Sequence, residues 1–174
     1  MHRFHADATT DTHMTAHIYS LSLTWTGNTG KGTSDYRAYD RRHEIAAPGK
    51  PAIPGSSDPH FRGDPARYNP EEMLVASLSA CHMLWYLHLA ATTSVVVTSY
   101  QDDAVGTMHE SSDGRGRFSE VVLHPAVTIQ AGSSVADAEA LHHRAHDMCF
   151  IANSVNFPIR CEPATTIEAT EAGA

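Results

Sequence analysis

Two cysteines, Cys81 and Cys149, are the residues of this sequence best suited to chemistry, because a cysteine thiolate is both a nucleophile and a redox group. They lie 68 positions apart, which excludes a local Cys-x-x-Cys redox loop. If the fold brings the two sulfur atoms together, they form a two-thiol redox centre. Considered alone, Cys81 is more simply explained as a small buried core residue, since free cysteine is among the most buried residue types.

Histidines near Cys149 open further explanations. His146 precedes it by three positions and His142 by seven, so all three share one face of a helix. His146 could tune the thiol, or His142, His146 and Cys149 could bind a metal ion. A chain with 13 histidines also places several on helix surfaces by chance. The sequence leaves these three explanations open.

Two helices are predicted to carry these cysteines. Asn69 is a favoured N-cap, Pro70 suits the first helical position and Glu72 completes a capping box. The segment 73–91 is apolar on nearly every side, which predicts a buried helix at the centre of the molecule. A second helix with a serine cap is predicted over residues 134–151.

Alternating and β-branched residues predict the strands, which cover residues 18–25, 35–45, 95–109, 118–129 and 157–167. The first two are expected to form a hairpin, and an irregular, proline-rich loop follows them. The grouping of strands around two helices predicts an α+β fold with antiparallel sheets, and not a doubly wound parallel sheet.

The length and composition are those of a globular protein with one hydrophobic core, at 174 residues with 41% hydrophobic content. We predict a single domain over residues 15–169. Residues 1–14 are expected to be a flexible N-terminal extension, and residues 170–174 a frayed tail.

The charge pattern limits the partners. A net charge of −8 argues against nucleic acid and anionic membrane surfaces, since both reward clustered lysine and arginine. Residues 1–13 are polar and lack the apolar stretch typical of a secretion signal, so we expect none, and we expect no apolar stretch to approach the roughly 20 residues that a membrane span needs. We therefore expect a cytoplasmic protein, in which a disulfide is more often catalytic than structural.

The residues around both cysteines resemble those of the OsmC/Ohr family, the osmotically inducible and organic hydroperoxide resistance proteins, and are most similar to its OsmC-like branch. The resemblance is carried by Asn69-Pro70-Glu71-Glu72, Ala76, Ala80-Cys81, Cys149, and Trp25-x-Gly27 with Gly30-Lys31-Gly32-Thr33. It covers roughly residues 18–167. It implies an OsmC-like fold, with antiparallel sheets around a long buried central helix, and an intertwined homodimer with active sites between the subunits.

The resemblance also implies a thiol peroxidase that uses neither metal nor flavin. Cys81 would attack a hydroperoxide, release an alcohol or water and become a sulfenic acid. Cys149 would then form a disulfide with Cys81. A dithiol reductant, in the family often a lipoyl-bearing protein, would restore both thiols. The apolar helix around Trp85 favours organic over small polar peroxides as substrates.

Members of the family also use a glutamate and an arginine. Glu71 has the family's ten-residue spacing from Cys81. This spacing is roughly 15 Å along a straight helix, so the carboxylate must reach the Cys81 of a partner subunit or act through a network. We predict that Arg62 takes the arginine role, with Arg41 and Arg42 as alternatives, because arginine stays charged and pairs with carboxylates.

Two positions depart from the family pattern. His60 stands where the OsmC-like branch has its arginine, and we predict that it lines the substrate site together with Phe61 and Trp85. Phe150 follows the second cysteine where many relatives have proline. These departures keep open a non-catalytic protein that binds a small apolar ligand, beside the metal-binding alternative. Cys161 matches no family cysteine and is predicted to be a buried packing residue.

Overall fold

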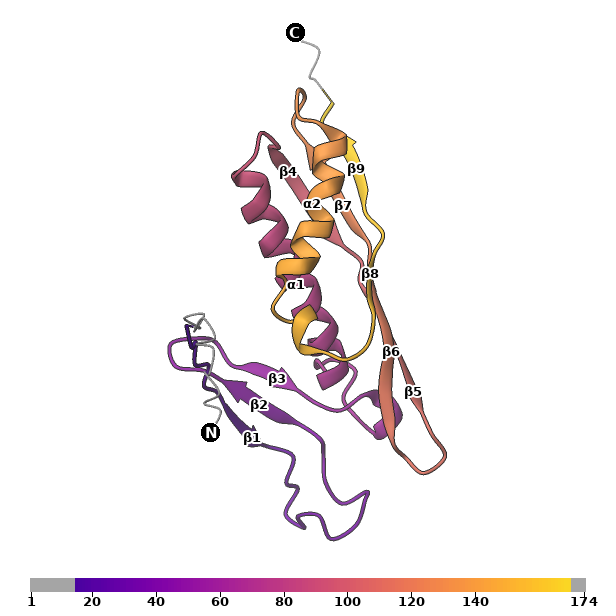
Figure 1. Cartoon of the computed structure of the whole chain (residues 1–174). Coiled ribbons are helices and arrows are strands. Elements are labelled where there is room, and N and C mark those ends of the chain that lie inside the picture. Colours follow the sequence, from indigo (N-terminus) through magenta and orange to yellow (C-terminus); the bar gives the residue numbers. More distant parts are fainter. Residues whose placement is uncertain (1–14, 170–174) are drawn as a thin grey trace, which may run out of the picture.

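This computed structural model describes residues 15–169 of the chain (Figure 1). Within them lie two α-helices and nine β-strands. The elements are β1 (Ser22–Trp25), β2 (His43–Ala46), β3 (Ile53–Gly55), α1 (Pro70–Ala91), β4 (Val97–Asp102), β5 (Val105–Glu110), β6 (Gly116–Leu123), β7 (Pro125–Ile129), α2 (Val135–Met148), β8 (Ile159–Cys161) and β9 (Ala164–Ile167). Short 3-10 helices occupy Pro59–Phe61 and Ala152–Ser154. The predicted α+β class is confirmed. The predicted extension and tail lie outside the described residues.

Helix α1 begins where the sequence predicts. The Asn69 side chain accepts a hydrogen bond of 2.7 Å from the backbone N–H of Glu72, and the Glu72 carboxylate accepts one of 3.1 Å from the backbone N–H of Asn69. This capping box satisfies two of the donors that a helix start leaves unpaired. The cap fixes the register of α1 and therefore the direction in which Cys81 points.

The burial of α1 is less complete than predicted. Leu78, Tyr86 and Leu89 are buried, whereas the side chain of Leu84 is 62% exposed. By length and composition alone α1 could cross a membrane, which corrects the expectation that no segment is apolar enough. The core helix of a soluble protein passes the same test, and α1 packs here against α2 and the neighbouring sheets.

The strands form three sheets of three strands each, ordered β1-β2-β3, β4-β7-β9 and β5-β6-β8. Most pairs are antiparallel as predicted, but β6 with β8 and β7 with β9 are parallel, which corrects the expectation of purely antiparallel sheets. Three predicted strands are each divided in two, so that β4, β7 and β9 share one sheet while β5, β6 and β8 share another. Pro125 begins β7, which a residue without an N–H tolerates at the first strand position.

The second predicted strand is shorter than expected. Residues 35–42 form turns and a single bridge between Asn28 and Tyr39, and only β2 pairs continuously with β1. The side chain of Asp35 accepts a hydrogen bond from the backbone N–H of Arg37, an arrangement that favours a turn over an extended strand.

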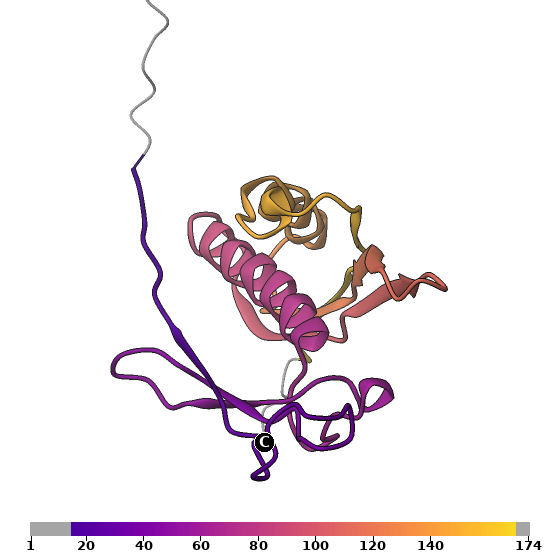
Figure 2. The same cartoon turned by 90° about the horizontal axis from the view of Figure 1, so that it is seen from below.

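The helices and sheets enclose two hydrophobic clusters. The first joins the C-terminal half of α1 to α2 and β7, through Tyr86, Leu89, Val127 and Leu141. The second joins the middle of α1 to β6, with Leu78 at its centre. In Figure 2, α1 lies between α2 and the β1-β2-β3 sheet. Both clusters hold α1 against α2 and the C-terminal strands, and the contact between α1 and α2 brings distant parts of the sequence together.

Candidate active site

Cys81 and Cys149 are neighbours in the fold, although 68 positions separate them in the sequence. Cys81 is half-buried in α1, and Cys149 is the C-cap of α2 with 1% of its surface exposed. Burial raises the pKa of the Cys149 thiol to about 11, and a hydrogen bond to the Cys81 side chain raises it as well. The Cys81 side chain therefore lies within interaction distance of the Cys149 sulfur.

Cys149 is more deeply buried than Cys81, and this burial determines the protonation state of Cys149. Cys149 keeps its proton at neutral pH, even though the backbone N–H of Ala152 lies 3.4 Å from its sulfur and acts in the opposite direction. The arrangement places a second thiol beside Cys81, as an intramolecular disulfide requires.

Each of the two cysteines has an aromatic residue close to it in the sequence. Trp85 is one helical turn after Cys81, and Phe150 directly follows Cys149. Their rings meet edge to face with centroids 5.5 Å apart. Trp85 also lines a small, mostly apolar pocket of about 200 Å³ with Leu84 and His88. This part of the site therefore offers apolar surface close to the two sulfur atoms.

Glu71 lies in a different place. It is half-buried in the first turn of α1 and lines a mostly apolar groove of about 790 Å³. Further lining residues are Asp58, Glu72, Val75, Ala76, Met83, Asp102, Met108 and Phe118. Cys81 does not line this groove, so within one chain Glu71 and Cys81 do not share a cavity.

Arg62 also lies apart from the cysteines within one chain. It lines a polar pocket of about 310 Å³ with Asp40, Arg41, Arg42, Ser56, Gly63 and Asp64. Its φ of 66° is unusual for a residue with a side chain, and its guanidinium carbon lies 5.9 Å from the centroid of the Tyr36 ring. His60 and Phe61 form the adjacent 3-10 turn, with their rings 5.4 Å apart. The predicted roles of Arg62, His60 and Phe61 therefore require the Cys81 of a second copy of the chain.

Of the alternative arginines, Arg41 has a structural explanation. Its guanidinium lies over the rings of Tyr36 and Tyr39, at 4.4 and 4.2 Å from their centroids. It also donates hydrogen bonds to the backbone carbonyl oxygens of the same two tyrosines. These contacts use two of its five N–H donors and hold the loop before β2 together.

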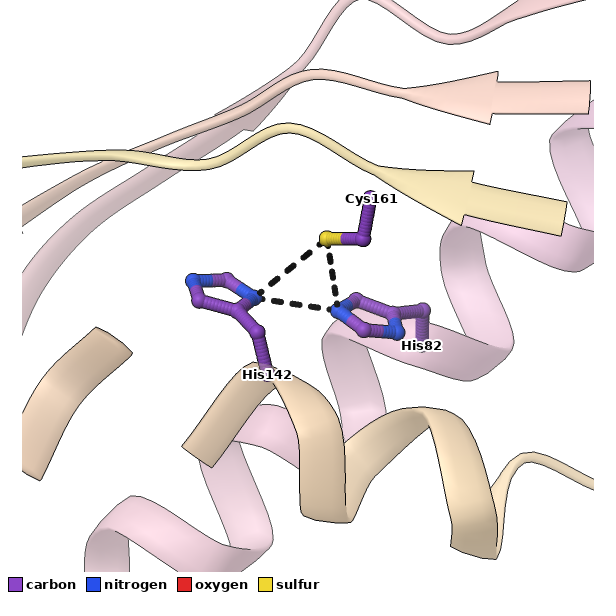
Figure 3. Close-up of side chains that lie close together, drawn as sticks. All are labelled: His82, His142 and Cys161. Atoms are coloured by element: carbon purple, nitrogen blue, oxygen red, sulfur yellow. Dashed lines mark hydrogen bonds between the residues drawn. The ribbon is translucent and has the colours of Figure 1, made fainter. Parts of the chain in front are cut away.

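A second cluster of reactive side chains, which we call the His–Cys cluster, consists of His82, His142 and Cys161 (Figure 3). His82 Nε2 lies 3.1 Å from His142 Nδ1, and the Cys161 sulfur lies 3.6 and 3.8 Å from these two nitrogens. The predicted metal set of His142, His146 and Cys149 is wrong for the described residues, because only His142 of that set belongs to the cluster.

The His–Cys cluster also corrects two sequence interpretations. Cys161 is half-buried and faces two imidazoles, so it is not a simple packing residue. His82 was not among the predicted site residues, although an imidazole inside an apolar helical run and directly after a cysteine was a signal for it. Burial lowers the pKa values of His82 and His142 to about 4, which keeps both rings neutral at pH 7.

The chain matches the family model described as OsmC-like protein over residues 63–163. A solved OsmC-like protein of unknown function from Vibrio cholerae is 36% identical, with a TM-score of 0.77, and the match covers 86% of this chain and 100% of that one. No curated protein matches the chain.

Two further solved structures are similar in fold. An organic hydroperoxide resistance protein OsmC from Legionella pneumophila is 16% identical with a TM-score of 0.61, covering 87% of this chain and 99% of its own. An organic hydroperoxide resistance protein from Elizabethkingia anophelis is 18% identical with a TM-score of 0.61, covering 88% and 100%. The family model spans more than half of this sequence, and the chain belongs to the OsmC-like family.

Proposed function

We propose that this protein is a cysteine-based thiol peroxidase that reduces organic hydroperoxides. The observation that carries the proposal is the proximity of Cys81 and Cys149, a half-buried and a buried thiol from two different helices. The names of two structural neighbours, both organic hydroperoxide resistance proteins, support the same chemistry.

The proposed reaction has three steps. The Cys81 thiolate attacks the O–O bond of the hydroperoxide, takes one oxygen and becomes a sulfenic acid, while the other oxygen leaves as an alcohol after taking a proton. The Cys149 sulfur then displaces the sulfenic hydroxyl, which leaves as water, and the two cysteines form a disulfide. A dithiol reductant, such as a lipoyl-bearing protein, transfers two electrons and two protons to restore both thiols.

The proposal assigns Glu71 and Arg62 to a site shared between two subunits of a homodimer. Several large apolar side chains are exposed in the single chain, among them Leu23 and Trp25 on β1 and Leu84 on α1. Apolar surface of this kind is typical of an interaction face. A second copy on these faces would cover them, and would offer a route by which Arg62 and Glu71 approach a Cys81.

The apolar surroundings of the cysteine pair support an organic substrate. Trp85 and Phe150 offer aromatic surface to an alkyl or aryl group, which a small polar peroxide would not use. We therefore expect faster turnover with cumene hydroperoxide than with hydrogen peroxide at equal concentration, measured with a dithiol reductant in the cytoplasmic pH range. A faster rate with hydrogen peroxide would contradict this substrate class.

The experiment that tests the proposal counts thiols. The fully reduced chain is treated with one equivalent of cumene hydroperoxide, and the remaining free thiols are titrated after denaturation. The peroxidase predicts the loss of two thiols per chain, and no such loss in Cys81→Ser. Unchanged thiols in the wild-type protein would refute the proposal.

The groove along α1 favours a second candidate, a protein that binds a small apolar ligand without reacting with it. The groove has the size of a small-molecule site, and Val75, Met83 and Phe118 give it apolar walls. Saturable binding of an apolar dye, together with thiols that do not respond to peroxide, would favour this candidate over the peroxidase.

A further inference from the structure

The His–Cys cluster gathers three potential metal ligands from three different elements. His82 comes from α1, His142 from α2 and Cys161 from the end of β8, and the ligand atoms of all three point to one place (Figure 3). Both histidines are almost fully buried. Imidazole nitrogen and thiolate sulfur are the ligand types that zinc prefers in proteins.

The distances within the cluster fit one face of a zinc tetrahedron. Zinc bonds of about 2.05 Å to nitrogen and 2.3 Å to sulfur place two nitrogens about 3.3 Å apart, and nitrogen and sulfur about 3.6 Å apart. The observed separations are 3.1 Å between the nitrogens, and 3.6 and 3.8 Å to the sulfur. A planar three-coordinate ion with the same bond lengths would place the two nitrogens about 3.6 Å apart and nitrogen and sulfur about 3.8 Å apart. The nitrogens are closer than this, at 3.1 Å, so the tetrahedral arrangement fits them better.

The charges around the cluster favour a cation. The carboxylate of Asp102 acts on both His82 and Cys161, and that of Glu162 acts on Cys161. Asp102 is held in place by hydrogen bonds from the Ser79 hydroxyl at 2.5 Å and from the backbone N–H of His124 at 2.7 Å. Two neutral imidazoles and one thiolate around Zn²⁺ leave one positive charge, which the nearby Asp102 offsets.

Packing alone does not explain why two histidines occupy this position. The Nε2 atom of His142 is buried and has no hydrogen-bond partner among the described residues. A buried polar atom without a partner lowers stability, and an apolar side chain would avoid this cost. The ring of His142 is nevertheless held firmly, stacked on Tyr86 with centroids 4.1 Å apart. A ligand role at Nδ1 accounts for a fixed imidazole at this position.

We propose that His82, His142 and Cys161 bind one zinc ion in a site separate from the Cys81–Cys149 pair. Binding displaces the proton of the Cys161 thiol, which leaves to solvent, and the two imidazoles bind in their neutral form. Water occupies the fourth position of the tetrahedron. The half-buried side chain of Cys161 gives the ion a path from solvent. The ion joins α1, α2 and β8 beside Cys81, and the proposal holds whether or not the cysteine pair reduces peroxides.

Cobalt substitution tests the site. The full chain carrying Cys81→Ser and Cys149→Ser, so that Cys161 is its one thiol, is stripped of metal and titrated with Co²⁺. We expect saturation at one ion per chain, with a thiolate-to-cobalt charge-transfer band and the intense visible bands of tetrahedral cobalt. Zinc should displace the cobalt and abolish the spectrum. His146→Ala, from the rejected metal set, is the matched control and should keep the same spectrum.

Cys161→Ser and His142→Gln separate a coordination role from a folding role. Each should weaken zinc binding by about 100-fold or more in competition with a chromophoric chelator. Zinc should also raise the thermal midpoint of the parent protein but not that of Cys161→Ser, whose serine keeps nearly the same volume. Tetrahedral cobalt bands of unchanged intensity after Cys161→Ser is added to the parent chain would overturn the site. So would a parent chain that binds no cobalt, or binds it without a thiolate band.

Discussion

Two clusters of reactive side chains lie beside α1, the Cys81–Cys149 pair and the His–Cys cluster. They differ in the side chains that surround the sulfur. Cys81 meets a second thiol, Cys149, whereas Cys161 meets two neutral imidazoles. Two adjacent thiols can form a disulfide when an oxidant such as a hydroperoxide accepts two electrons, whereas a thiol beside two imidazoles can share a metal ion with them. The comparison teaches that the neighbours of a cysteine, more than its burial, decide its chemistry.

One helical turn serves both groups. Cys81 and His82 are consecutive, so their side chains leave α1 about 100° apart and face different neighbours. Cys81 faces the end of α2 at Cys149, and His82 faces His142 and Cys161. The close packing of α1 on α2 therefore places adjacent residues in two different side-chain clusters, for which we propose different chemistry.

The largest expected effect separates the two groups by activity. Cys81→Ser should abolish peroxide consumption, because a hydroxyl at this position remains protonated and cannot replace a thiolate nucleophile. Turnover with cumene hydroperoxide and a dithiol measures the loss. Arg144→Ala, an exposed change on α2, is the control and should keep full activity. Substantial turnover in Cys81→Ser would move the reactive sulfur to the other group.

Cys149→Ser should stop the reaction after one turnover. Without a resolving thiol, Cys81 remains a sulfenic acid and excess peroxide carries it on to sulfinic acid. Intact-protein mass spectrometry would show an added mass of one and then two oxygens. Continued turnover in this variant would show that Cys161 or an external thiol resolves the sulfenic acid instead.

The raised pKa of Cys149 predicts a slow thiol. Burial raises this pKa from 9.0 to about 11, so near pH 9 only about 1% of the folded protein carries the thiolate, against about half of an unfolded chain. Alkylation of Cys149 by iodoacetamide should be about 50-fold slower in the folded state at pH 9. Because the pKa is higher in the folded state, the contribution of this thiol to the free energy of unfolding is complete below pH 9. It is lost as the pH rises through about 11.

Residue-resolved mass spectrometry of alkylated peptides measures this rate. The denatured chain at the same pH is the control, since it exposes the same thiol to water. If Cys149 reacts at the same rate in the folded and the denatured protein, then Cys149 is not buried beside Cys81 in solution.

The smallest expected effect falls on both groups equally, because both depend on the register of α1. Asn69→Ala removes the side-chain oxygen that accepts the 2.7 Å bond from Glu72 N–H, while the backbone N–H of residue 69 can still donate to Glu72, and it should lower the free energy of unfolding by about 1 kcal/mol. Denaturant titration measures the change. Ser134→Ala at the start of α2 removes one bond of 3.2 Å and should have a smaller effect. Equal effects would show that the shorter bond at Asn69 adds no stability over the longer bond at Ser134.

The sequence predicted the positions that depend on local chemistry. The start of α1 was evident from Asn69, Pro70 and Glu72, and the start of α2 from Ser134, since capping is determined within a few residues. The family resemblance and the α+β class were confirmed. The spacing of Glu71 and Cys81 predicts no direct contact within one helix, and of the two only Glu71 lines the groove along α1.

Features that depend on distant contacts could not be predicted in the same way. The parallel pairing of β6 with β8 depends on how the chain returns after α2, which no local pattern records. The convergence of His82, His142 and Cys161 needs three elements to pack in a particular register. The exposed face around Leu84 shows why an apolar helix does not by itself establish burial within one chain.

Disulfide mapping after a single oxidation tests the central claim most directly. The reduced protein receives one equivalent of cumene hydroperoxide, free thiols are alkylated, and peptides are mapped without reduction. The account predicts a Cys81–Cys149 disulfide within one chain and Cys161 recovered as an alkylated thiol. A disulfide that contains Cys161, or three alkylated thiols in protein that has met the peroxide, would contradict it.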